Sequence, residues 1–403
     1  MKILILGNDG YIGYPLTLHL LKKGYKVFGV DDYSRRRRVN EVNSDSLTPI
    51  LSAIGRKGYL SHKYKESFIA QVDISLGTDT QGFIQSVLSS LKPDCIIHLA
   101  EMPSAPWSMR DAEYCRTTQQ ENIIGTLDLL WAMKEECHNA HLIKLGTMGE
   151  YGTPDCIIPE GEIPKLCQRS HIHHVDKIGE VKYHSECPME GLLFPRSPNS
   201  FYHLSKVHDT HNIIFACRNW EIRSTDIMQG VVFGLGYEGT DMVDEELTRF
   251  DYDEYFGTAL NRFCAQAIIG HPLTVYGKGD QQRGFLPLQD SIDCLTIAIE
   301  NPPDMGEYRT FNQFENIYSI NKLTDMVCKS AMELGLDFGI EYINNPRNEL
   351  EEHYYNPQHQ KLLDLGYKPT EDIQGEITTL IRRLLPYKDR IIEKVIMPKT
   401  NWR

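Results

Sequence analysis

The chain opens with Met1-Lys-Ile-Leu-Ile-Leu-Gly7-Asn-Asp-Gly10-Tyr-Ile-Gly13, which is its strongest indication of fold class. An apolar run typical of a buried strand leads straight into three spaced glycines, and a helical pattern follows through Lys23. The order of strand, turn and helix predicts a dinucleotide-binding unit. In such a unit Gly7 permits the tight turn, Gly10 lets the backbone approach a pyrophosphate, and Gly13 allows close helix packing.

A second apolar run, residues 26 to 30, ends in Asp31 and Asp32. A carboxylate at this strand end accepts hydrogen bonds from ribose hydroxyls and repels a 2′-phosphate, which favours NAD over NADP. Arginines 35 to 38 argue the other way, but they lie several residues into a loop, so NAD is the predicted cofactor. The other predicted cofactor contacts are Asp9, Tyr11, Ile12, Arg35, Asp73, Ile74, Leu99, Ala100, Glu101 and Asn122, together with Tyr202 and Lys206.

Tyr202 and Lys206 are four residues apart on a predicted helix, which places a phenol and an ammonium on one face. A fixed positive charge beside a phenol favours the phenolate and lowers its pKa, so the pair is suited to proton transfer. Thr147 follows an apolar stretch that predicts a strand end, where its hydroxyl can share the same substrate oxygen. These three side chains are the predicted catalytic core.

Composition limits the possible functions. The 403 residues leave room for a nucleotide domain and a second lobe, and the net charge of −13 argues against nucleic-acid binding. No run of 18 apolar residues suggests a membrane span, and strand residues begin at Met1, so we expect no signal peptide and a cytoplasmic protein. The ten cysteines form no Cys-x-x-Cys pair and are expected to be reduced. One stretch is rich in possible zinc ligands: Cys156, Cys167, His171, His173, His174, His184 and Cys187. The spacings between these residues match no zinc module, so no metal is predicted.

Apolar strands alternate with helical patterns in the order expected for a doubly wound parallel sheet. The predicted class is α/β, a Rossmann fold with a smaller, discontinuous, mixed α/β substrate lobe. We assign residues 1–226 to the NAD-binding domain and 227–403 mainly to the substrate lobe, with some segments returning to the first domain. Residues 34–66 are predicted to be a polar loop, and the proline-rich residues 153–199 an inserted loop at the active-site rim.

Several longer sequence motifs carry a family resemblance. The most discriminating are Leu145-Gly-Thr-Met-Gly-Glu-Tyr-Gly-Thr-Pro154 and Asn345-Pro-Arg-Asn-Glu-Leu-Glu-Glu-His-Tyr-Tyr-Asn356, and further matches fall at residues 201–209, 226–234, 255–263, 276–279 and 282–285. With these motifs the chain resembles the extended short-chain dehydrogenase/reductases of the nucleotide-sugar epimerase and dehydratase group. Within that group it most resembles the UDP-sulfoquinovose synthase family.

The resemblance implies that UDP-glucose and sulfite give UDP-sulfoquinovose, with NAD regenerated in each cycle. Hydride would pass from C4 to NAD while the Tyr202 phenolate removes the hydroxyl proton, assisted by Thr147 and Lys206. The new ketone acidifies the C5 proton. Loss of that proton and of the C6 hydroxyl gives a conjugated enone, to which sulfite adds at C6 before hydride returns to C4. The product would serve a sulfolipid or a surface glycan.

The resemblance does not directly assign the residues that transfer protons at C5 and C6. A sugar 4,6-dehydratase usually carries two acidic residues directly after the threonine, where this chain has Met148 and Gly149. His203, beside Tyr202, is the first candidate for the displaced role, and Glu150 is the second. The alternatives are a packing histidine and a glutamate that only bonds backbone.

Substrate binding calls for two fixed cations facing a diphosphate, and the resemblance places them at Arg283 and Arg347. Gln229 and Thr258 are predicted to line the sugar and uridine pocket. One departure from plant members is Met102-Pro103, where those carry Gln-Arg, so a cation for sulfite must come from elsewhere.

Three other functions remain open: UDP-glucose 4-epimerase, nucleotide-sugar 4,6-dehydratase, and a non-catalytic NAD-sensing protein. The expected partners are UDP-glucose and sulfite, with a sulfite-donating protein as a further possibility. By resemblance, helices near residues 113–136 and 201–220 form a homodimer contact, or part of a higher oligomer.

Overall fold

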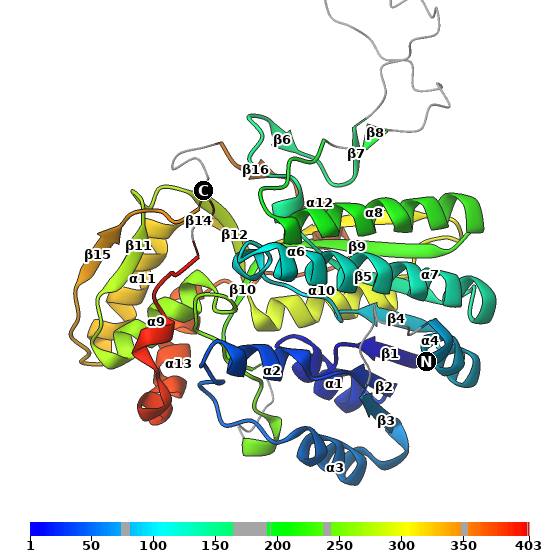
Figure 1. The fold of residues 1–403 in the computed structure, drawn as a ribbon, viewed down its shortest axis with the longest axis horizontal. Coiled ribbons are helices and arrows are strands. Elements are labelled where there is room, and N and C mark those ends of the chain that lie inside the picture. The colour runs from blue at the N-terminus through cyan, green and yellow to red at the C-terminus, as the bar shows by residue number, and fades with distance from the viewer. Residues whose placement is uncertain are drawn as a thin grey trace, which may run out of the picture.

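The computed structural model describes residues 1–73, 81–163, 192–193, 195–236, 243–347, 354–400 and 402. Within them, seven strands form one sheet in the order β13-β9-β5-β4-β1-β2-β3, and every neighbouring pair is parallel (Figure 1). The strands are β1 (Lys2–Leu6), β2 (Lys26–Asp31), β3 (Phe68–Asp73), β4 (Cys95–His98), β5 (His141–Thr147), β9 (Arg223–Gln229) and β13 (Tyr308–Gln313). The predicted α/β class is confirmed.

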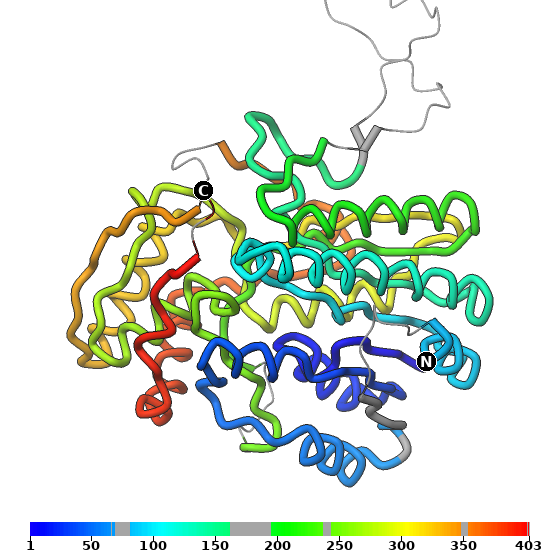
Figure 2. Tube along the Cα trace, in the orientation of Figure 1, coloured from blue at the N-terminus to red at the C-terminus, as the bar shows by residue number. Residues whose placement is uncertain are grey.

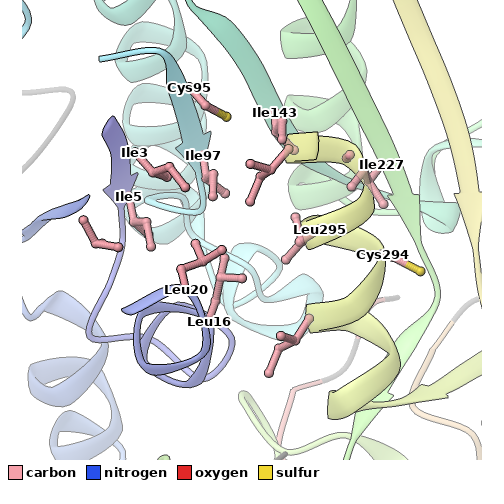
Figure 3. Close-up of a cluster of buried hydrophobic side chains, with 14 of the residues drawn as sticks. Ile3, Ile5, Leu16, Leu20, Cys95, Ile97, Ile143, Ile227, Cys294 and Leu295 are labelled. Atoms are coloured by element: carbon pink, nitrogen blue, oxygen red, sulfur yellow. The ribbon is translucent and has the colours of Figure 1, made fainter. Parts of the chain in front are cut away.

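Helices cover both faces of this sheet because its strands are apolar on both sides. Ile3 and Ile5 of β1 point into one core, and Leu4 and Leu6 point into the other, as the two-residue period of a strand requires (Figure 3). The first core packs against α1 (Gly13–Lys22) and α10 (Leu288–Glu300), and the second against α4 (Gln81–Leu91), α7 (Gly125–Glu136) and α8 (Phe201–Trp220).

The parallel arrangement brings the carboxyl ends of the strands to one edge. Gly7 follows β1, Asp31 ends β2 and Thr147 ends β5, so residues far apart in sequence meet there. In an open α/β sheet this edge, where the strand order reverses beside β1, is where ligands bind.

The predicted loop at residues 34–66 is wrong, because two helices occupy it: α2 (Ser34–Glu41) and α3 (Ala53–Tyr64). Val39 is the one buried apolar residue of α2, so the helix shows no apolar stripe. The long helix predicted near residues 113–136 is confirmed in outline as α6 (Ala112–Gln119), a π-helical turn at Gln120–Ile124, and α7.

A second lobe lies beside the sheet domain (Figure 2). It has its own apolar core. Its elements are α9 (Ala259–Ile269), α11 (Ile320–Glu333), α13 (Ile373–Leu384), a three-stranded sheet of β10 (Val231–Phe233), β12 (Gln282–Pro287) and β14 (Asn316–Ser319), and the pair β11 (Leu273–Tyr276) and β15 (Ile340–Ile343). Between them the chain returns to the large sheet as β13. The proposed boundary at residues 226 and 227 falls inside β9.

The remaining helices and strands are short. They are α5 (Ala105–Ser108), α12 (Gln360–Asp364), and the pairs β6 (Ile157–Ile158) with β16 (Asn356–Pro357) and β7 (Glu162–Ile163) with β8 (Leu192–Leu193). Most of the predicted insertion at 153–199 lies outside the described residues. None of the helices in the described ranges is long and apolar enough to cross a bilayer. The cytoplasmic location stays a prediction.

Candidate active site

One cavity of about 480 Å³ runs along the carboxyl edge of the sheet and into the second lobe. It joins the glycine turn, the predicted catalytic core and both predicted substrate arginines in a single space. The predicted residues that line it are Gly7, Gly10, Tyr11, Ile12, Gly13, Asp31, Asp32, Arg35, Leu99, Ala100, Glu101, Thr147, Tyr202, His203, Lys206, Gln229, Thr258, Arg283 and Arg347. Asp9, Asn122 and Glu150 are not among its lining residues. Ile74 and the side chain of Asp73 lie outside what the structure describes.

The glycine turn fits a dinucleotide because it leaves no room for side chains. Gly7 has φ +88°, and a Cβ there would lie 2.7 Å from the carbonyl carbon of Leu99. A Cβ on Gly13 would lie 2.1 Å from the carbonyl oxygen of Gly7. The backbone of the turn and the first turn of α1 therefore face the cavity directly, as pyrophosphate binding requires.

Asp9 braces this turn instead of lining the cavity. Its carboxylate accepts hydrogen bonds from Arg36 Nε at 2.6 Å and Arg56 Nη1 at 2.8 Å. Burial acts to raise the pKa of Asp9, but the two guanidinium groups hold it below its usual value. Its backbone N–H donates to Asp31 Oδ2 at 2.7 Å, so the brace also fixes the carboxylate at the end of β2. Burial, and then the charge of Asp9, raise the pKa of Asp31 to about 7.

The arginine run is already neutralised, which supports the choice of NAD over NADP. Each guanidinium pairs with a carboxylate, and the pairs are Arg35 with Asp251 (2.8 Å), Arg36 with Asp9 (2.6 Å), Arg37 with Asp32 (3.0 Å) and Arg38 with Glu121. A 2′-phosphate at this edge would meet Asp31 and Asp32 and would compete for cations that have partners.

The predicted catalytic core does meet in the cavity. Thr147 ends β5, and α8 carries Tyr202 and Lys206 one turn apart, with the Thr147 hydroxyl hydrogen-bonded to the Tyr202 phenol. The Lys206 ammonium donates to the carbonyl oxygen of Leu145 at 2.8 Å and forms an ion pair with Glu101. Burial lowers the pKa of Lys206 to about 8.

The pKa of the Tyr202 phenol moves in the opposite direction to the one that the sequence predicted. Burial and then the negative charge of Glu150 raise the pKa of Tyr202 above its ordinary value, and the hydrogen bond from Thr147 only partly opposes them. Lys206 Nζ lies 6.0 Å from the centre of the Tyr202 ring and is paired with Glu101. Its charge is therefore balanced by Glu101 and does little to lower the pKa of Tyr202.

The His203 ring lies beside the Tyr202 ring, with centres 4.9 Å apart, and beside Gly149. A Cβ on Gly149 would lie 2.3 Å from His203 Nε2, so a carboxylic side chain at position 149 and this imidazole exclude each other. Nδ1 lies 2.9 Å from Ser200 Oγ and 2.9 Å from Asn199 Oδ1, which turns Nε2 towards Gly149. Burial, and then the charges of Arg347 and Arg283, lower the pKa of His203 to about 3, so the ring is neutral.

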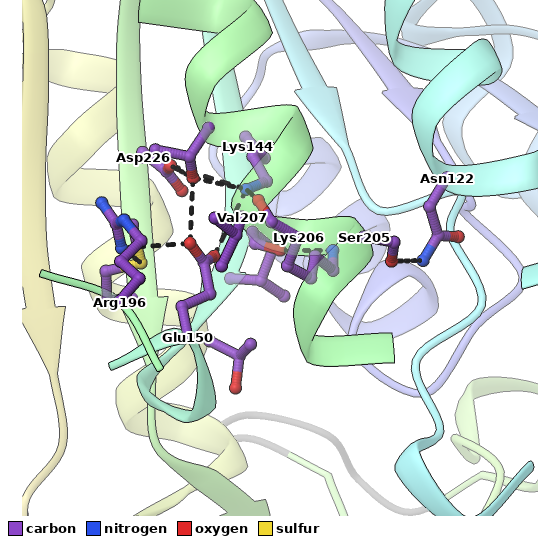
Figure 4. Close-up of polar contacts among 12 residues, drawn as sticks. Asn122, Lys144, Glu150, Arg196, Ser205, Lys206, Val207 and Asp226 are labelled. Carbon is purple, nitrogen blue, oxygen red and sulfur yellow. Dashed lines mark hydrogen bonds and ion pairs between the residues drawn. The ribbon is translucent and has the colours of Figure 1, made fainter. Parts of the chain in front are cut away.

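Glu150 belongs to a buried charge cluster behind the cavity wall, defined by Lys144, Glu150, Arg196 and Asp226 (Figure 4). Lys144 Nζ lies 3.4 Å from Glu150 Oε1 and 3.6 Å from Asp226 Oδ2, and Arg196 Nη1 lies 3.0 Å from Glu150 Oε2. Burial raises the pKa of Glu150 while the two cations oppose that rise. With its oxygens engaged behind the wall, Glu150 is placed to support the site rather than to reach a hexose.

Asn122 also supports the site from behind. Its amide bonds both the N–H and the carbonyl oxygen of Met102, at 2.7 and 3.2 Å, and donates to Ser205 Oγ at 2.8 Å. It thereby ties the loop after β4 to the α8 turn that carries Lys206 (Figure 4).

On the substrate side, Arg283 is the second residue of β12 and Arg347 lies in the segment after β15, and both line the cavity. Thr258 caps α9, and the Gln229 amide donates to Ser291 Oγ at 2.6 Å and Gln313 Oε1 at 2.7 Å. Sequence reasoning missed Trp402, which lines the cavity beside Arg347.

Within the residues described, no group of three or more His, Cys, Asp or Glu side chains is placed to hold a metal ion. Of the stretch considered for zinc, Cys156 is exposed, and the other six residues lie outside the described ranges.

Comparison with known proteins gives consistent results. The model of the NAD dependent epimerase/dehydratase family matches residues 3–178. The chain is 44% identical over 403 residues to the chloroplastic UDP-sulfoquinovose synthase of Spinacia oleracea, covering 100% of this chain and 79% of that protein. It is 42% identical over 407 residues to the UDP-sulfoquinovose synthase of Sulfolobus acidocaldarius, covering 100% and 98%. The structure of UDP-glucuronic acid 4-epimerase from Bacillus cereus, with UDP-glucuronic acid and NAD, shares the fold with a TM-score of 0.65 at 20% identity, over 97% of this chain and 100% of that one.

Proposed function

The chain belongs to the UDP-sulfoquinovose synthase family, and we propose that it converts UDP-glucose and sulfite into UDP-sulfoquinovose. The observation that carries the proposal is the full-length match to two such synthases from a plant and an archaeon. The single cavity supports it, since a glycine turn, a Thr-Tyr-Lys core and two arginines open onto one space. That space suits a dinucleotide at one end and a nucleotide sugar at the other.

The glycine turn and Asp31 hold the cofactor, which fits because the turn presents bare backbone and the carboxylate faces the cavity. When bound, NAD supplies the hydride acceptor for the first step and the hydride donor for the last. Tyr202 exchanges a proton with the C4 hydroxyl of the hexose, and Thr147 shares the same oxygen through its bond to the phenol. Lys206 is held in place by Glu101 and Leu145.

We assign the C5 and C6 proton transfers to His203. Its Nε2 edge occupies the space beside Gly149 where a dehydratase carries a carboxylate, and the neutral ring keeps a lone pair to accept the C5 proton. The same nitrogen then protonates the departing C6 hydroxyl, which leaves as water. Sulfite adds to C6 of the resulting enone, C5 regains a proton, and the C4 ketone is reduced.

The test is mass spectrometry of UDP-glucose incubated with the NAD-loaded protein, with and without sulfite. A sulfonated UDP-hexose that forms only with sulfite supports the proposal. UDP-galactose formed without sulfite would identify an epimerase, and a 4-keto-6-deoxy product would identify a dehydratase. Unchanged UDP-glucose under both conditions, with NAD bound, would favour a non-catalytic NAD-binding protein.

Sulfite supply is tested by the same assay, because a rate that saturates with inorganic sulfite alone needs no donor protein. We keep the cytoplasmic location as part of the proposal, to be checked by cell fractionation.

We also propose a homodimer built through the α6–α7 unit and α8. Large hydrophobic side chains are exposed along this surface, at Ile124, Trp131, Phe201 and Phe215. Trp131 lies against Trp220 with ring centres 4.7 Å apart, so an aromatic patch continues from α7 to α8. Light scattering after gel filtration should give twice the chain mass of 46.3 kDa, and Phe215→Lys should shift it towards the monomer.

A further inference from the structure

Trp402 lies outside every motif that the sequence suggested, yet it lines the active-site cavity. The guanidinium carbon of Arg347 sits 5.4 Å from the centre of the Trp402 ring, within the range of a cation–π contact. The backbone N–H of Trp402 donates to the carbonyl oxygen of Pro346 at 3.2 Å. Two neighbouring residues, Pro346 and Arg347, are thus held by one tryptophan.

The segment that carries Trp402 is fixed to the wall of the cavity. The Thr400 N–H donates to Glu254 Oε1 at 2.6 Å, and the Thr400 hydroxyl lies 3.2 Å from the Tyr255 hydroxyl. Glu254 is buried, and both it and Tyr255 line the same cavity. Thr400 and the Trp402 backbone are therefore held from two directions, by the residues before α9 on one side and by the segment after β15 on the other.

We propose that Trp402 is a positioning residue for the nucleotide diphosphate, holding the Arg347 guanidinium at the cavity where the phosphate oxygens bind. This inference rests on the proposed function, since it takes Arg347 as a diphosphate ligand. A half-buried arginine pays side-chain entropy when a ligand fixes it, and a preformed stacking partner removes part of that cost before binding. A guanidinium face stacked on an indole still presents its N–H edge to an anion.

The test measures UDP and uridine binding by calorimetry to the NAD-loaded full chain. Trp402→Ala should weaken UDP binding about fivefold, as expected for loss of one cation–π contact, and should leave uridine binding unchanged because uridine carries no phosphate. Trp402→Phe should retain most of the affinity. Met332→Ala is the matched control, because Met332 is a large side chain, 72% exposed, that does not line the cavity.

The route through Arg347 is tested by a double-mutant cycle. If Trp402 acts through Arg347, the double variant Trp402→Ala/Arg347→Ala should bind UDP no more weakly than Arg347→Ala alone. Additive losses, or an equal loss of uridine affinity, would overturn the proposal, the latter because the indole would then contact the base. Unchanged UDP affinity in Trp402→Ala would overturn it as well. Retained NAD content in each variant shows that the fold is intact.

These measurements do not depend on sulfite chemistry. A wild-type protein that binds UDP but makes no sulfonated product would disprove the proposed function while leaving the Trp402 test decisive. In the turnover assay the positioning role predicts a higher KM for UDP-glucose in Trp402→Ala with little change in kcat.

Discussion

Replacing Lys144 by methionine should destabilise the protein strongly, because it removes a cation from the buried charge cluster. Lys144 is fully buried, and its ammonium lies between Glu150 and Asp226. Methionine fills similar space but leaves both carboxylates facing one fewer cation. Breaking a buried pair in this way typically costs about 3–5 kcal/mol.

That cost can be converted to a melting temperature. An unfolding entropy of roughly 2.1 cal/mol/K per residue gives roughly 0.85 kcal/mol/K for a chain of 403 residues. We therefore expect Lys144→Met to lower the melting temperature by about 4–6 °C at one fixed scan rate. Activity should fall mainly through kcat, because Lys144 Nζ also donates to the carbonyl oxygen of Lys206 at 2.9 Å and so fixes the α8 turn that carries the proposed catalytic pair.

The matched control is Lys23→Met, which removes an ion pair of 2.7 Å with Glu300 from a site where both side chains are about 40% exposed. An exposed pair contributes up to about 1 kcal/mol, so this control should lower the melting temperature by no more than about 1 °C. The double variant Lys144→Met/Glu150→Gln should recover part of the loss, since one of the two carboxylates that lost this cation is then neutral. Equal melting temperatures for Lys144→Met and Lys23→Met would refute this account of the cluster.

Gly149→Ala should displace the His203 ring and lower kcat far more than it changes KM. Gly58→Ala is the control and should leave turnover unchanged, because a Cβ there has open space. Similar rates for the two variants would contradict the assignment of His203. NAD should bind about 100-fold more tightly than NADP, because a 2′-phosphate faces Asp31 and Asp32, and comparable dissociation constants would show that the arginine run is available after all. Burial and two nearby arginines lower the pKa of His203 to about 3, and UDP should raise it by neutralising those cations. The NMR titration of His203 should therefore move to higher pH when UDP is present. An unmoved midpoint would mean that the diphosphate binds elsewhere.

The sheet domain was predictable because its signals are local. The apolar run of β1 leads into Gly7, Gly10 and Gly13, and this order specifies strand, turn and helix without help from distant residues. The spacing of Tyr202 and Lys206 likewise fixes their common face on α8. Their meeting with Thr147 then follows from the parallel order of the strands.

Side chains whose direction depends on distant partners were not predictable. Helix α2 has almost no apolar face and is held by carboxylates such as Asp251 and Glu121, far along the chain. Asp9 lies within the glycine motif but is absent from the cavity lining, because Arg36 and Arg56 bind its carboxylate. No local pattern marks such pairs.

Two further residues show the same limit at the active site. Glu150 belongs to the same motif as Thr147, but its ion pairs with Lys144 and Arg196 hold it behind the cavity wall. Trp402 reaches the cavity only because the chain folds back across the second lobe, which no nearby sequence motif signals.

The position of β13 has a consequence for how the protein is made. β9 gains its outer neighbour only when β13 emerges roughly 80 residues later, which at about 5–20 residues per second leaves its edge open for roughly 4–16 s of translation. An unpaired strand edge is a template for aggregation, so a nascent chain stalled in this interval is the form most in need of a chaperone. Truncation before residue 308 would make that exposure permanent, and a cofactor-binding fragment should therefore be designed to retain β13.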